Sequence, residues 1–185
     1  NPVVKTNDDN TKGFFNAVNG ATIKKLGIAN FSFEGSRATG NKSTDLGGFA
    51  GAATDTKFDQ CYFTGKVVGR DHVGGFVGGN THNVTITNSF VNADVFALSQ
   101  AGGFFGVSAG DVKMENCYFA GSVKLNPADH RGWAGGFLGL VDEDCTVTIQ
   151  GCVSIGDVQG ADAAGFFIGG NGTTPEEPRG VINFK

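Results

Sequence analysis

The chain has 185 residues, among them 31 Gly and 17 Phe but only four Pro, and is long enough for one domain with a substantial core. Charged residues make up 17% of the chain and the formal net charge is −4, which argues against nucleic-acid binding because a nucleic-acid-binding protein carries a basic stripe. No apolar run approaches the ~20 residues of a membrane-spanning helix, so we expect no membrane span in this segment.

A short glycine-aromatic motif recurs along the whole chain. Gly-Gly-Phe occurs four times, beginning at Gly47, Gly74, Gly102 and Gly135. A weaker copy precedes these four at Lys12, and another follows them at Ala164. From Gly47 onward, successive copies are 27, 28, 33 and 29 residues apart. Periods of roughly 20–50 residues are typical of solenoids, propellers and related arrays, so the motif predicts a repeat protein.

A second motif lies between the glycine motifs and has the period-2 alternation of a half-buried strand. Its copies are IANFSFEG, FDQCYFTG, ITNSFVNA, MENCYFAG and IQGCVSIG, at residues 28–35, 58–65, 86–93, 114–121 and 149–156. The apolar residues change parity in the middle of each copy. This change predicts a sharp corner at a residue that tolerates left-handed backbone, namely Asn30, Gln60, Asn88, Asn116 or Gly151. We expect the amides at these corners to stack, and the Gly that ends a block to form a second corner.

These patterns together predict an all-β protein, a right-handed parallel β-helix of about six coils of roughly 27–35 residues with three short strands each. Stacked coils about 4.8 Å apart pair each other's backbone edges and cover each other's apolar side chains. Equivalent residues then lie over one another, so we expect an internal ladder of phenylalanines: Phe14, Phe49, Phe76, Phe104, Phe137 and Phe166. At the two ends either residue of Phe14-Phe15 and of Phe166-Phe167 could occupy the ladder.

The pairing of GGFVG with ITNSFVNADV, and of GGFFG with MENCYFAGSV, resembles the GLUG-motif repeat family, with Phe in place of the Leu. The resemblance covers nearly the whole chain. It implies a parallel β-helix from secreted or surface-exposed bacterial proteins, including adhesin-like polypeptides and regions near immunoglobulin A peptidases. It supplies no catalytic residues.

The sequence shows no group of acidic, basic or nucleophilic residues with the spacing of a catalytic or metal-binding site. Asp and Glu are scattered over different loops, the glycine runs lack the Lys-Ser/Thr of a P-loop, and no CxxC is present. We therefore expect no enzyme, metal site or cofactor.

Three of the four cysteines share one repeat position, which Phe31 and Ser89 occupy in the other coils: Cys61, Cys117 and Cys152. We expect them to form a column of reduced thiols, because stacked side chains are poorly placed for a disulfide. Cys145 lies outside that column.

Two features are candidates for ligand binding. The insertion at residues 124–134 carries the chain's one tryptophan, Trp133, beside Asp129, His130 and Arg131, and would suit a sugar ring or a protein partner. Trp133 could equally pack over the coil beneath it. The second feature is an outward row of Tyr62, Phe90 and Tyr118, continued by Val153 and Ser32, which would be either a contact site or a surface covered by an adjacent domain.

We expect residues 1–185 to form a single solenoid that is part of a longer protein, because its terminal segments match interior coil segments. The expected function is a non-catalytic structural or adhesion module, extracellular or on a bacterial cell surface. A glycan, a surface protein or adjacent domains of the same polypeptide are its expected partners. The alternative is a carbohydrate-active β-helix enzyme or its accessory carbohydrate-binding domain.

Overall fold

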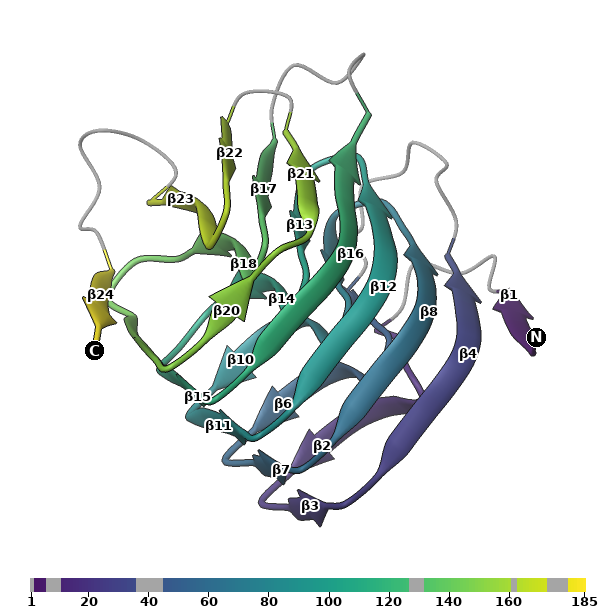
Figure 1. Cartoon of the computed structure of the whole chain (residues 1–185), viewed down its shortest axis with the longest axis horizontal. Coiled ribbons are helices and arrows are strands. Elements are labelled where there is room, and N and C mark those ends of the chain that lie inside the picture. Colours follow the sequence, from purple (N-terminus) through teal and green to yellow (C-terminus); the bar gives the residue numbers. More distant parts are fainter. Residues whose placement is uncertain (1, 6–10, 36–44, 127–131, 161–162, 173–179) are drawn as a thin grey trace.

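The computed structural model describes residues 2–5, 11–35, 45–126, 132–160, 163–172 and 180–185. Every strand pairing in these segments is parallel, and the strands form four sheets that run along the axis of a β-solenoid (Figure 1). The described residues contain no helix, and none of their segments could cross a bilayer as a long apolar helix. The strands make about five turns, and β22–β24 begin a further one.

Sheets A and D meet at the predicted corners. Sheet A contains β1 (Val3–Lys5), β4 (Gly27–Glu34), β8 (Tyr62–Val68), β12 (Phe90–Ala97), β16 (Tyr118–Leu125), β20 (Val153–Ser154) and β21 (Asp157–Gln159). Sheet D contains β3 (Thr22–Lys24), β7 (Lys57–Asp59), β11 (Val84–Thr87), β15 (Val112–Glu115), β19 (Thr146–Gln150) and β24 (Val181–Phe184).

Sheets B and C flank the Gly-Gly-Phe motifs. Sheet B contains β5 (Asp45–Gly47), β9 (His72–Gly74), β13 (Gln100–Gly102), β17 (Trp133–Gly135) and β22 (Ala163–Gly165). Sheet C contains β2 (Phe15–Asn19), β6 (Ala50–Thr54), β10 (Val77–His82), β14 (Phe105–Ser108), β18 (Leu138–Val141) and β23 (Ile168–Asn171). A full coil thus has four strands rather than three, because the chain turns at each Gly-Phe pair and divides the expected third strand in two.

The glycines allow sheets B and C to pack with their backbones in contact. A Cβ built on Gly102 would lie 1.9 Å from the carbonyl oxygen of Phe105 and 2.8 Å from the backbone nitrogen of Gly139. A Cβ on Gly139 would in turn lie 2.8 Å from the backbone of Ala101. No side chain fits between the two sheets at this level, so the motif requires glycine for close approach.

The phenylalanine ladder is confirmed in the interior, and the structure decides its two ends. Phe49, Phe76, Phe104 and Phe137 are fully buried, with ring centroids of neighbours 4.6, 5.8 and 4.9 Å apart. Phe167 continues the ladder at 5.2 Å from Phe137, and Phe15 lies 5.9 Å from Phe49. The expectation of Phe14 and Phe166 was wrong: their side chains are 48% and 71% exposed.

The corners predicted at Gln60, Asn88, Asn116 and Gly151 are confirmed, since all four have φ between 50° and 57°. The first coil is different. Lys24 pairs with Asp59, so Lys25, at φ 56°, takes the place of Gln60.

Asn30 also has a positive φ, but it lies at a register irregularity within β4 between Ile28 and Phe31. The expected corner at Asn30 and the alignment of residues 28–35 were therefore wrong. The second corner was also wrong, because Gly65 and Gly121, at φ 141° and 116°, lie inside β8 and β16.

Candidate functional site

The outer face of sheet A carries the aromatic row predicted from the alternation. Phe90 pairs with Tyr62 on one side and with Tyr118 on the other. The residues that follow them, Phe63, Val91 and Phe119, are fully buried, so the row points outward. The side chains of Phe90 and Tyr118 are 38% exposed and Tyr62 is half-buried. Val153 pairs with Tyr118 and continues the row, as expected.

The first member of the row differs from the prediction because of the irregularity in β4. Gly27, and not Ser32, pairs with Tyr62. The tyrosine ring lies over this glycine, and a Cβ there would overlap the ring. The other face of the Tyr62 ring stacks on Phe90, with centroids 4.9 Å apart and planes within 5° of parallel. Tyr62 is thereby held in place.

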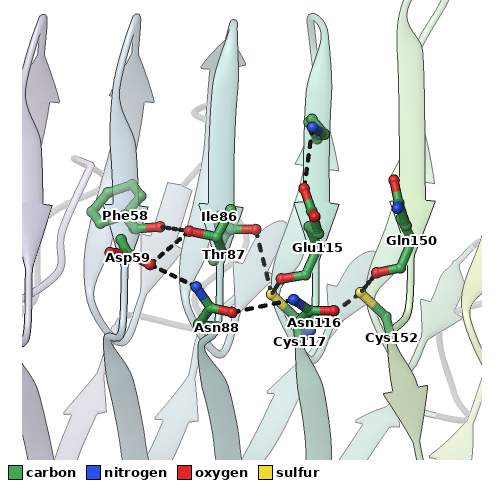
Figure 2. A network of polar contacts seen from close by, with 11 residues as sticks. Phe58, Asp59, Ile86, Thr87, Asn88, Glu115, Asn116, Cys117, Gln150 and Cys152 are labelled. Atoms are coloured by element: carbon green, nitrogen blue, oxygen red, sulfur yellow. Dashed lines mark hydrogen bonds and ion pairs between the residues drawn. The ribbon is translucent and has the colours of Figure 1, made fainter.

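A shallow hollow of about 540 Å³ lies beside Phe90 and Tyr118, and is lined also by Asn88, Ser89 and Asn116. The two asparagines come from the corner positions of neighbouring coils. Their left-handed backbone directs the amides along the stack, where the Asn116 amide donates to Asn88 Oδ1 at 3.2 Å (Figure 2). The predicted amide ladder is therefore present at these two coils.

The ladder ends in a carboxylate on one side and in a glycine on the other. Asn88 and Thr87 donate to Asp59 Oδ1 at 2.9 and 2.8 Å, and these hydrogen bonds lower the pKa of the Asp59 carboxyl. At the other end, Gly151 has no side chain with which to continue the amide ladder. A Cβ there would lie 2.8 Å from Asn116 Oδ1, so this oxygen faces the space above the glycine.

The rest of the outer face of sheet A is mainly polar and mixed in charge, with the half-buried Phe96 as a further aromatic residue. Exposed Asn92, Asp94 and Lys66 lie further along the same strands, and Ser122 donates to Asp94 Oδ1 at 2.7 Å. The face therefore combines exposed aromatic side chains, amides and hydroxyls on a rigid parallel sheet.

The Trp133 candidate lies in another sheet. Trp133 is the first residue of β17, where it pairs with Gln100 and Ala163. Its half-buried indole covers Gly170 on the next coil, where a Cβ would fall 2.3 Å from the ring. The structure thus supports packing over the neighbouring coil rather than a projecting loop. Asp129, His130 and Arg131 lie outside the described residues.

A buried acid–histidine pair was missed in the sequence. Asp45 Oδ1 lies 2.7 Å from His72 Nδ1, and the Asp45 residue is 4% exposed. The two residues are paired in sheet B, each two positions before the first glycine of its motif, and are 27 residues apart. Aligning the motifs would have placed them side by side, so the repeat period itself was the available signal. The pair ties neighbouring coils together.

All four cysteines are free thiols in the structure. The predicted column contains Cys61, Ser89, Cys117 and Cys152 on successive coils. Phe31 was wrongly included in this column, because the irregularity in β4 displaces it from the register. Cys145 is buried directly after Asp144, a left-handed residue, and burial raises the pKa of its thiol to about 11. Among the described residues, no three His, Cys, Asp or Glu side chains gather as metal ligands would.

No protein-family model matches this chain, and the comparison with curated proteins found no match.

Proposed function

We propose that this chain is a non-catalytic structural or adhesion module, secreted by or displayed on a bacterial cell, whose sheet A binds a glycan on its outer face. The observation that carries the proposal is the exposed aromatic row beside the Asn88 and Asn116 amides. An aromatic surface next to amide donors and acceptors suits a sugar, which offers C–H groups to a ring and hydroxyls to amides.

The aromatic row has no part in filling the core. The buried residues next to it on each strand provide the core packing, while Phe90 and Tyr118 each remain 38% exposed to water. A row on three neighbouring coils also repeats at the coil spacing of about 4.8 Å, which gives an extended ligand several equivalent contacts.

The resemblance to GLUG-motif repeats supports the proposed location and the adhesive role. The same face could serve an accessory carbohydrate-binding domain of a β-helix enzyme, so hydrolysis or elimination of a bound polysaccharide would favour that alternative. A surface protein or another protein domain is the other partner that the row would accept.

A glycan array probed with the isolated chain tests the proposal. We expect binding to a subset of glycans, weakened about tenfold or more by Tyr118→Ala, which corresponds to about 1.4 kcal/mol. Thr85→Ala, on the outer face of sheet D, is the matched control and should bind as the unchanged chain does. Binding that is absent, or that survives Tyr118→Ala and Phe90→Ala together, would refute the glycan assignment.

A further inference from the structure

Two thiols stand at equivalent places on neighbouring coils. Cys117 and Cys152 each follow a left-handed corner, at Asn116 and Gly151, and the next residues, Tyr118 and Val153, are paired in sheet A. The backbone nitrogen of Cys117 donates to Cys152 Sγ at 3.3 Å (Figure 2). Paired parallel strands lie about 4.8 Å apart, which is within the ~4.4–6.8 Å between Cα atoms that a disulfide spans. The sequence led us to expect poor placement because stacked side chains point the same way, so the two thiols must rotate away from the carbonyls of Glu115 and Gln150, to which they donate, before the sulfurs can bond.

The two thiols also differ in reactivity. A hydrogen bond between them lowers the pKa of Cys152 and, together with burial, raises that of Cys117. Cys117 is 2% exposed, whereas Cys152 is only partly buried. Cys152 is therefore the thiol that a dissolved reagent reaches first, and it is the one with more thiolate.

We propose that Cys117 and Cys152 form a redox modification site, which a small-molecule disulfide such as oxidised glutathione converts into an intercoil disulfide. The Cys152 thiolate attacks one sulfur of the oxidant, forms a mixed disulfide and releases one small thiol. Cys117 then loses its proton and attacks the Cys152 sulfur, which expels the second small thiol. The protein loses two protons and two electrons, which together are two hydrogen atoms, and one oxidant molecule takes them up to become two thiols.

The disulfide would fasten a short, interrupted strand pairing of sheet A. β20 pairs with β16 through Tyr118–Val153 and Phe119–Ser154, and β21 pairs with β16 further along through Ser122–Asp157 to Lys124–Gln159, whereas β12 pairs with β16 along the whole of both strands without a break. Val153 and Ile155 are 51% and 64% exposed. A covalent link at Cys152 would hold this coil against its neighbour, and an oxidising compartment would preserve the link.

The test is to incubate the folded chain with oxidised glutathione and to measure its intact mass. The unchanged chain should lose two hydrogen atoms, remain monomeric on a non-reducing gel, and unfold at a higher temperature than the reduced chain. Serine is the matched substitution, since Ser89 already fills this column and accepts the Cys61 N–H at 3.0 Å. Cys152→Ser should not lose the two hydrogens, and Cys117→Ser should keep one glutathione on Cys152.

Cys61→Ser and Cys145→Ser are the controls, and both should still form the disulfide. An unchanged chain that keeps all its hydrogens, or that stops only at a mixed disulfide, would overturn the proposal. Loss of the intramolecular disulfide in Cys145→Ser would overturn it too, because it would assign the link to Cys145. Since the unchanged chain gives a result by itself, a variant that fails to fold does not remove the test.

Discussion

The packing of sheets B and C at the glycine motif gives a quantitative prediction for Gly102→Ala. The new methyl carbon would lie 1.9 Å from the Phe105 carbonyl oxygen and 2.8 Å from backbone atoms of Phe137 and Gly139. The chain would have to open by about 1 Å in a close-packed interior. These atoms belong to backbone on two coils, so no side-chain rotation can relieve the contact.

Overpacking usually costs about 1–3 kcal/mol, and the rigid backbone at this site places Gly102→Ala at or above ~3 kcal/mol. In a chain of this size the midpoint of thermal unfolding should fall by roughly 6–12 °C. Gly35→Ala is the matched control: its nearest atom would be Leu46 Cδ2 at 3.4 Å, and its φ is not left-handed. That variant should be neutral or stabilised by about 0.4–1 kcal/mol. Calorimetry or urea unfolding of both variants provides the measurement, and equal stabilities would refute the close-packing argument.

Three further outcomes follow from the ladder and the corners. Phe104→Ala should lose about 3–5 kcal/mol in urea unfolding because the ring is fully buried, whereas Phe166→Ala, with its exposed ring, should change stability by less than about 0.5 kcal/mol. Asn116→Gly should cost at least about 1 kcal/mol less than Asn116→Val, since φ is 53° there and a β-branched residue resists that backbone; similar stabilities would contradict a left-handed corner. Asn88→Ala should raise the pKa of the Asp59 carboxyl, followed by NMR titration. Because this pKa is lowered on folding, its contribution to stability is present above the unfolded-state pKa and is lost as the pH falls through the folded-state value. An unshifted titration would exclude the Asn88 hydrogen bond as the cause.

The aromatic row and most of the corners could be predicted because they depend on local patterns that recur. The alternation of apolar and polar residues alone predicts that Tyr118 points outward and Phe119 inward. The change of parity predicts a left-handed backbone conformation at Asn88 and Asn116. The hollow beside the row could not be predicted in the same way, because it depends on how amides from two coils stack.

The first and last coils show where the pattern was insufficient. In β4 an irregularity at Asn30 displaces the register, so the corner falls at Lys25, a residue type that gives no turn signal. At Phe166-Phe167 both residues are phenylalanine, and only stacking on Phe137 decides which ring is buried.

The repeat, the parallel stacking and the inward and outward faces follow from the amino-acid sequence, because period and alternation are local properties that recur in each coil. The contacts between coils depend on the three-dimensional packing. The packing of Trp133 over Gly170 and the Asp45–His72 pair both depend on the register between coils, as does the approach of Cys152 to Cys117. Loop length and bulges set that register, and stacking fixes it by bringing backbones and side chains from distant positions within contact distance.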